Sequence, residues 1–358
     1  MKKTVLLVVF ALICNTGLAQ KNKSVLGGVI GKPQTTNQGI TSATSSSVKS
    51  KESQQASMPA ITFPLPLKKG NSFYYIISCE HFANQVKKSD EVEAWNFRVT
   101  NETTDGYSIE AELLGYGVTH SEGGLMQELL SIQHKTRVHN ILKFKANKNG
   151  EIVDLQNADA VRNEGNRIAT KAILEIIDKY PQLRNDTKLQ SALDKQISEY
   201  LSKEELLNWA NSDYNPLGLS TIVYNRTIKD GMKEEYISGE GLKLTKQFKS
   251  EFNKNGQVEI STRSRITSAE IKSQAIEQLI SKHPEDKKYI QENIDVILKN
   301  SGLNYQLLDF YTLYTFRGNS DQGWPYSIEK IKKVDNSTTK IFSTIVSKDE
   351  LKEYGVNL

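Results

Sequence analysis

Apolar and polar residues alternate along two neighbouring stretches in the first half of the chain. Residues 95–99 and 107–113 each place apolar side chains at every second position, and Asp105-Gly106 separates the two stretches. Alternation with a period of two puts the apolar side chains on one face of a strand. Asp-Gly tolerates the positive φ of a tight hairpin turn. The pattern therefore predicts an antiparallel hairpin with one covered face and one wet face.

Further strands and helices follow from the same kind of pattern. Helical spacing of apolar residues between the strand runs predicts helices, and Ser202 with Glu205 is typical of a capping box. Ser268 is expected to cap a helix of the second half, Pro284 fits the first turn of the next helix, and Gly302 ends it. The strand runs are 73–77, 138–144, 310–316 and 341–346, with turns at Asn149-Gly150, Asp230-Gly231 and Asn255-Gly256, and the helical stripes are 168–180, 189–197, 271–280 and 289–297.

The order strands, helices, strands, helices, strands predicts an α+β fold. We expect a curved, half-barrel-like antiparallel sheet whose concave apolar face is covered by two helical insertions. The two insertions share an internal sequence repeat, here called the internal echo. Asn147 to Gly150 precedes a helix that ends at Tyr180-Pro181, and Asn253 to Gly256 precedes a helix that ends at His283-Pro284. This repetition indicates a duplication with pseudo-repeats at about 61–215 and 216–358.

The N-terminus has the pattern of a signal peptide, with Lys2 and Lys3 before the apolar run 5–13 and cleavage expected after Ala19. Cys14 could be lipidated, but the preceding Ile13 is not small, so lipoprotein processing is disfavoured. Residues 20–60 are rich in Ser, Thr and Gln and are expected to form a disordered linker. Residues 61–358 then form the α+β domain.

After cleavage Cys79 is the only cysteine, so no intramolecular disulfide is possible. The two lysines of the signal peptide leave with it, and the remaining chain has a formal net charge of +2. Such a balance gives no reason to expect nucleic acid. The chain after residue 19 has no apolar run of membrane-spanning length. These features predict a periplasmic or extracellular protein without an integral membrane span.

The sequence carries no familiar catalytic motif, which favours a non-enzymatic protein. Cys79 and His81 are two apart and would share a strand face, as a reactive thiol with its base or as two metal ligands. A buried cysteine beside an ordinary histidine is the favoured interpretation, and no metal or cofactor is expected. His134 and His139 are five apart, which on a strand puts them on opposite faces.

A ligand contact is expected in two places. His120 begins a loop with Gly123-Gly124 next to a sheet end, where functional residues are common. Tyr314, Trp324 and Tyr326 belong to an aromatic-rich region that could stack on a sugar or grip an apolar ligand. Aromatic residues on strands are more often part of the core, and that alternative stays open.

The run from Leu65 to Tyr74, with an apolar segment, Gly70 and an aromatic strand start, resembles the opening of some exported bacterial envelope proteins of unknown function. The resemblance covers about residues 65–155. It implies an envelope location and an antiparallel β scaffold, and it brings no catalytic residues.

Three functional hypotheses remain. The first is an exported, non-enzymatic carrier for an apolar or lipid-like ligand held between sheet and helices. The second is an envelope assembly or adhesion component that binds protein or glycan. The third is a hydrolase with a non-local site, for which only Cys79 and His81 offer themselves. A carrier predicts an apolar cavity, whereas an assembly component predicts a filled core with exposed apolar residues.

Overall fold

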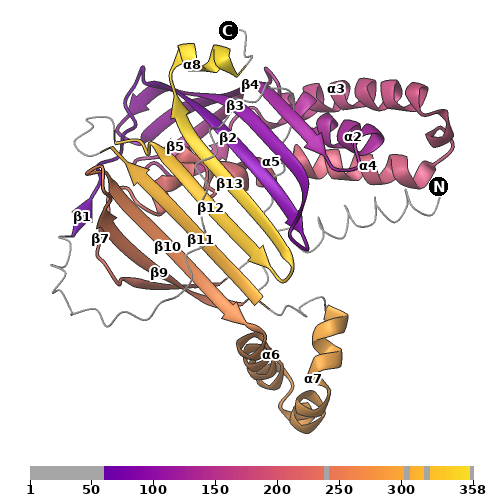
Figure 1. Cartoon of the computed structure of the whole chain (residues 1–358), viewed down its shortest axis with the longest axis vertical. Helices are drawn as coiled ribbons and strands as arrows, with labels where there is room; N and C mark the ends of the chain where they lie inside the picture. The colour runs from indigo at the N-terminus through magenta and orange to yellow at the C-terminus, as the bar shows by residue number, and fades with distance from the viewer. Residues whose placement is uncertain (1–59, 238–241, 302–306, 318–322, 355–358) are drawn as a thin grey trace.

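The computed structural model describes residues 60–237, 242–301, 307–317 and 323–354. An 11-stranded, curved antiparallel sheet dominates the molecule, in the order β6-β5-β4-β3-β2-β13-β12-β11-β10-β9-β8 (Figure 1). The predicted α+β class and antiparallel sheet are confirmed. The predicted signal peptide and nearly all of the linker lie outside the described residues.

The strands of the large sheet follow the chain in two blocks, joined where β13 pairs with β2. The predicted turn at Asp105-Gly106 is confirmed, because it joins β3 to β4. A second, two-stranded sheet pairs β1 (Ile61–Thr62) with β7 (Thr227–Ile228). The strands of the large sheet are β2 Ser72–Ala83, β3 Val86–Thr103, β4 Gly106–His120, β5 Leu142–Asn147, β6 Ile152–Leu155, β8 Lys233–Ile237, β9 Lys243–Phe252, β10 Val258–Thr267, β11 Leu307–Phe316, β12 Ser327–Val334 and β13 Ser337–Val346.

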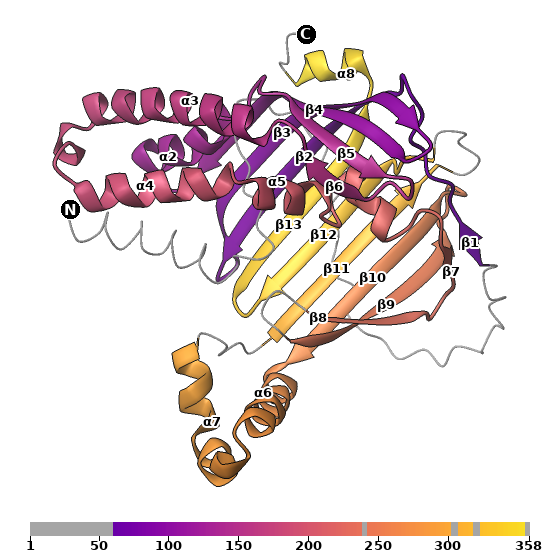
Figure 2. The same ribbon diagram turned by 180° about the vertical axis from the view of Figure 1, so that it is seen from behind.

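One face of the sheet, here called the covered face, is apolar and lies beneath the chain between α5 and β7 (Figure 2). This segment, residues 201–228, is called the cover. Trp209 of the cover packs 4.5 Å from Trp95 between ring centroids, and Phe97 and Phe144 lie around the same ring. The helices are α2 Gly124–Lys135, α3 Ala158–Lys179, α4 Thr187–Tyr200, α5 Lys203–Ala210, α6 Ser268–Lys282, α7 Lys287–Ser301 and α8 Lys348–Glu353, with short 3-10 turns at Pro181–Leu183, Pro216–Thr221 and Pro284–Asp286.

The expectation that both helical insertions cover the sheet is wrong for both helix pairs. The stripes of α3 and α4 pack with α2 in a cluster of their own beside the sheet, and only α5 and the rest of the cover lie on the covered face (Figure 2). The pair α6 and α7 projects away from the end of β10 (Figures 1 and 2). Part of its apolar stripe is buried within the pair, where Ala275, Ile294 and Leu298 form a small cluster, whereas Tyr289 of the same stripe is 62% exposed. Ile271 alone joins α6 to buried residues of the neighbouring strands. The covered face carries the cover instead, whose Trp209 and Tyr214 belong to the main apolar core.

Three local expectations also need correction. The loop expected after His120 is short, since α2 starts at Gly124; His134 therefore lies on a helix and not on a strand. The N-cap of α6 is Thr267, which forms a capping box with Glu270, and Ser268 is the first helical residue. Pro284 starts a 3-10 turn before α7. Gly302 lies outside the described residues.

The two units of the internal echo share their local geometry. The side-chain oxygen of Asn147 accepts hydrogen bonds from the backbone N–H groups of Asn149 and Glu151. The Asn253 side chain accepts the same two bonds, two and four residues further along. Each unit then has a helix, a 3-10 turn that begins at proline and a second helix. They differ in the sheet, since β6 is an edge strand and β10 is not.

Candidate functional site

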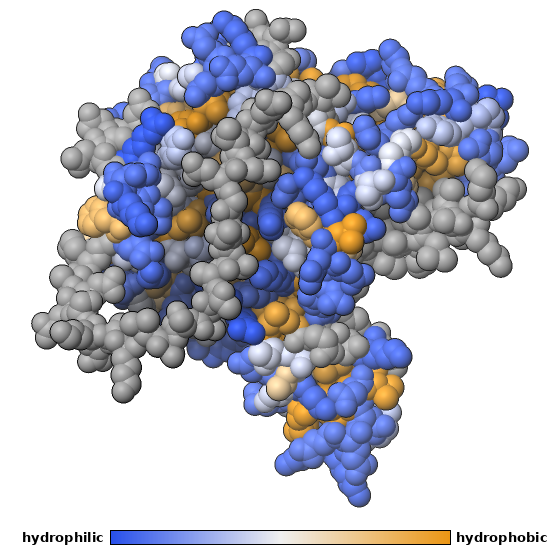
Figure 3. Space-filling view, viewed as in Figure 1, coloured by the Kyte–Doolittle hydropathy of each residue, from blue (hydrophilic) through white to orange (hydrophobic). Residues whose placement is uncertain are grey.

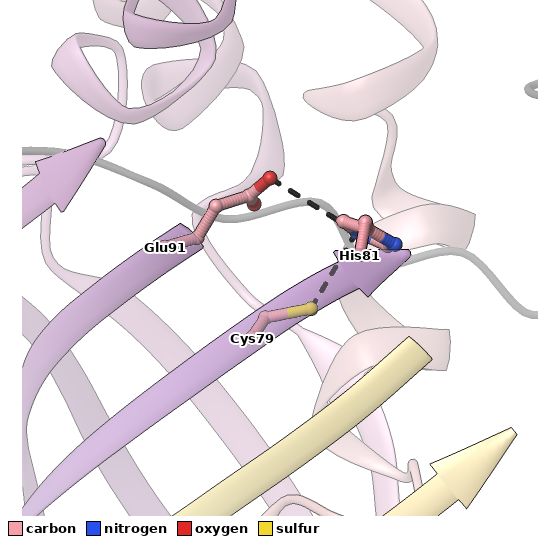
Figure 4. A group of neighbouring side chains, drawn as sticks. All are labelled: Cys79, His81 and Glu91. Atoms are coloured by element: carbon pink, nitrogen blue, oxygen red, sulfur yellow. Dashed lines mark hydrogen bonds and ion pairs between the residues drawn. The ribbon is translucent and has the colours of Figure 1, made fainter. Parts of the chain in front are cut away.

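The strand pairing of β2 with β3 brings a carboxylate next to Cys79 and His81. Cys79 lies directly opposite Glu91, and His81 lies opposite Ser89. Figure 4 shows the three side chains converging from the two strands, with Cys79 Sγ 3.5 Å and Glu91 Oε1 4.0 Å from His81 Nε2. Cys79 and Glu91 are each 2% exposed, whereas the His81 side chain is 37% exposed. The thiol and the carboxylate of the cluster are thus buried, and solvent reaches the cluster only at the imidazole of His81.

Two hydroxyl groups support this cluster. Thr339 Oγ1 of β13 lies 3.0 Å from His81 Nδ1, so the ring is held by its second nitrogen. Ser89 Oγ donates a hydrogen bond of 2.8 Å to Glu91 Oε1. These contacts fix the orientations of the imidazole and the carboxylate, as outer partners do around metal ligands.

The electrostatics disfavour a nucleophilic thiolate. Burial raises the pKa of the Cys79 thiol well above its ordinary value, and the charge of Glu91 raises it further. Desolvation, with the nearby charge of Lys332, lowers the pKa of His81 to about 4. A thiol activated for attack needs a lowered pKa and commonly an imidazolium partner. The pair is therefore a protonated thiol beside a neutral imidazole at neutral pH, which favours the reading of a buried cysteine over that of a reactive thiol.

A second polar group lies further along the covered face, between β3, α2 and the start of the cover. Glu93 accepts a hydrogen bond from the indole of Trp95, and its Oε1 lies 3.0 Å from His134 Nδ1. Arg137 is 1% exposed and stacks 3.7 Å above the ring of Tyr200. Its Nη2 donates to the Tyr200 carbonyl oxygen, whereas Nε and Nη1 have no hydrogen-bond partner among the described residues.

Sequence reasoning missed Arg137 because nothing local distinguishes it. It follows the end of α2, which was itself not expected, and only the tertiary fold buries it. A signal is present in hindsight. Leu125, Met126, Leu129 and Leu130 have the spacing of one helix face and could have indicated α2, but Arg137 lies beyond the end of that helix.

The predicted ligand residue His120 lies near the Cys79 cluster. His81 and His120 are both paired with Ser89, one from β2 and the other from β4, so the three residues form one row across neighbouring strands. Paired residues of antiparallel strands share a face. His120 Nδ1 accepts a hydrogen bond from the backbone N–H of Glu122, and burial lowers its pKa.

The three predicted aromatic ligand residues lie apart from that row. Tyr314 is fully buried on β11, and Trp324 is 5% exposed and packs 4.3 Å from Phe73 between ring centroids. Both belong to the main apolar core, as the alternative interpretation expected. Tyr326 is partly buried, with the guanidinium of Arg317 4.5 Å above its ring.

No family model and no curated protein matches this chain. Among solved structures, the chain is similar to one described as "Lipid-protein interactions in lipovitellin", with a TM-score of 0.35 and 8% sequence identity. The similarity covers 78% of this chain and 25% of that structure, so the chain spans about a quarter of its length. Within the described ranges, no helix has the length and apolar character needed to cross a membrane.

Proposed function

We propose that this chain is an exported, non-enzymatic binding protein of the cell envelope, and that its ligand is lipid-like with an acidic head group. The observation that carries the proposal is Arg137. A buried guanidinium with Nε and Nη1 unpaired among the described residues lies beside the aromatic wall of the covered face. Unpaired buried donors cost free energy, by about 1–3 kcal/mol and more for charged groups. A carboxylate or phosphate on an apolar body would satisfy both donors.

The cover contributes more donors of the same kind. Trp209 Nε1 and Asn215 Nδ2, and Trp324 Nε1 next to the cover, are buried without hydrogen-bond partners among the described residues. Ester or hydroxyl oxygens of a lipid-like molecule are acceptors for such groups. The buried donors at the interface between sheet and cover would therefore be satisfied by an apolar ligand with several oxygens. A purely structural core would leave them without acceptors.

The ligand must displace part of the cover to enter. A space of about 10 Å³ lies between α2, α3 and α4, and a second of the same size lies where Pro216 and Leu217 meet Leu65, Gly150 and Trp324. Each holds roughly one water molecule. The second space borders the cover and the Trp324 indole, and we infer that opening starts there.

All three tryptophans of the chain, Trp95, Trp209 and Trp324, line the interface between sheet and cover, which gives a direct test. Native mass spectrometry of the 20–358 chain, with organic extraction, asks whether a lipid co-purifies. In parallel, a brominated fatty acid is titrated against the delipidated protein. Saturable quenching of tryptophan fluorescence, reversed by the unbrominated acid, is the expected result.

Arg137→Gln is expected to weaken binding of the brominated acid at least tenfold, because it removes the cation that pairs with the carboxylate. Arg167→Gln is the matched control, since Arg167 is exposed on α3 and pairs only locally with Glu164. A bare mass together with unchanged fluorescence would reject the carrier. Equal affinity of both variants would reject the role of Arg137.

An envelope assembly or adhesion component is the second candidate, and the filled core favours it. The projecting α6–α7 pair carries exposed Tyr289 and Val296, 62% and 58% accessible, and hydrophobic residues gather on it in Figure 3. Such residues on an isolated projection fit a protein or glycan partner. A bare mass in the experiment above, with a partner captured by the wild type but not by a chain lacking the pair, would favour this candidate.

A further inference from the structure

We propose that Cys79, His81 and Glu91 bind one Zn²⁺ ion. Thiolate sulfur, imidazole nitrogen and carboxylate oxygen are all ligands that zinc uses in proteins. The three ligand atoms lie within 4.8 Å of one another. This inference is independent of the proposed lipid ligand, which is assigned to Arg137 and the cover.

The distances suit a tetrahedral ion. Zn–S bonds of about 2.3 Å and Zn–N bonds of about 2.0–2.1 Å at tetrahedral angles separate sulfur from nitrogen by about 3.5 Å. Cys79 Sγ and His81 Nε2 are 3.5 Å apart. The Nε2 to Glu91 Oε1 distance of 4.0 Å must close by roughly half an ångström.

The surroundings are those of a built site. Thr339 Oγ1 holds the second nitrogen of His81, and Ser89 Oγ donates to the Glu91 carboxylate. Outer contacts of this kind orient metal ligands. The ligands come from two paired strands, a rigid support, and the partly exposed His81 gives the ion a path from solvent.

The local charge favours a cation. Four carboxylates act on the Cys79 sulfur, those of Glu91, Glu80, Glu93 and Asp90. Lys87 donates hydrogen bonds to Glu80 and Asp90, which offsets part of their negative charge. The positive charge of Lys332 near His81 also opposes cation binding. The two innermost carboxylates, Glu91 and Glu93, lie on the covered side with Cys79. Binding releases the thiol proton to solvent, and three protein ligands leave a fourth position for water.

Cobalt(II) is the probe that tests this site, because Cys79 is the only cysteine of the 20–358 chain. Titration of the metal-free protein with Co²⁺ is expected to give a thiolate-to-cobalt charge-transfer band that saturates at one ion per chain. Zn²⁺ should abolish the band by displacement. Cys79→Ser should remove it, and Glu91→Gln and His81→Ala should each weaken Co²⁺ binding at least tenfold.

Two further variants make the result specific. Thr339→Val leaves all three ligands in place and should weaken binding by about tenfold. His283→Ala is the control, since His283, Glu285 and Asp286 form an exposed group with similar ligand spacing. Circular dichroism verifies the fold of each variant. Absence of the band at saturating Co²⁺, or unchanged binding in both Glu91→Gln and His81→Ala, would overturn the proposal.

Discussion

At the scale of single residues, the molecule is unusual for the polar side chains that it buries on an otherwise apolar sheet face. Glu91 and Glu93 continue the inward row of Trp95 and Phe97 along β3 and are 2% and 0% exposed. Burying a charge is costly unless it is paired and hydrogen-bonded. Burying two carboxylates of one strand, with His134 and Arg137 nearby, costs free energy that a purely structural core would avoid.

His134 gives a prediction for the pH dependence of stability. Burial lowers its pKa in the folded protein, against the opposing effect of Glu93. The unfolded chain therefore binds a proton more readily, and the free energy of unfolding should fall as the pH drops below about 6.5. One such group contributes a slope of at most about 1.4 kcal/mol per pH unit.

His134→Gln should reduce this slope between about pH 6.5 and 5, a window above the range in which carboxylates titrate. Part of the slope should remain, because the pKa values of His81 and His120 are lowered as well. Urea unfolding followed by circular dichroism at several pH values measures it. His139→Gln is the control, because His139 lies in an exposed pair with Glu112. Identical slopes for the wild type and His134→Gln would contradict the assignment.

The candidate site could be predicted only in part from the sequence. The two-residue spacing of Cys79 and His81 correctly predicts that they share a strand face. Glu91 could not be found this way, because its position opposite Cys79 depends on the register of β2 against β3, which a β-bulge next to His81 alters. Register is a property of the paired strands and cannot be derived from either strand alone.

At the scale of elements, the cover is the part of the chain on which the core depends most. Trp209→Ala should lower the free energy of unfolding by about 3–5 kcal/mol, since a fully buried indole packed on three aromatic rings leaves a large cavity. Leu174→Ala on α3 is the matched control, because its side chain is 57% exposed. Chemical unfolding of both variants compares them; similar losses would show that the cover is only loosely packed.

The two asparagine turns predict a matched pair of effects. Asn147→Ala and Asn253→Ala each remove two hydrogen bonds to backbone N–H groups. They also remove the bonds that the amide groups donate, one to Glu151 from Asn147 and two, to Gln257 and Glu259, from Asn253. Each should cost about 1–2 kcal/mol of stability. Asn149→Ala is a control, since it changes the same turn but keeps the accepting side chain. Clearly unequal losses at Asn147 and Asn253 would argue that the two turns are not equivalent.

Strands and hairpin turns were predictable where alternation is strong, as in β3 and β4. The helix α2 was not predicted, because His120 to Gly124 reads as a loop and the helical spacing that follows spans only residues 125–132. The direction in which each helix pair leaves the sheet could not be predicted from the sequence either. The stripes of α3 and α4 and of α6 and α7 resemble those of helices that lie on a sheet, but nothing in them says that the first pair packs with α2 and that the second pair packs on itself.

At the scale of the whole molecule, α6 and α7 form an appendage that the sheet does not need. Thr267 and Leu307 are paired neighbours at the ends of β10 and β11, so a two-residue Asn-Gly turn can replace residues 268–306. The shortened chain should fold and lose only about 2 kcal/mol, mainly from Ile271, which is 1% exposed. Thermal unfolding and circular dichroism measure this. Loss of all cooperative unfolding would mean that the pair is part of the core.

The pairing of β13 with β2 has a consequence for how the chain reaches its native state. Val346 meets Tyr74 and Ile345 meets Tyr75, contacts between residues near opposite ends of the described chain. Until the last strand is available, the two blocks of the sheet present bare edges toward each other and cannot be joined. Closing so long a loop is entropically costly and slow. Synthesis must therefore pass β13 before the central seam can form, and until then the two blocks of the sheet stay open to unwanted strand pairing.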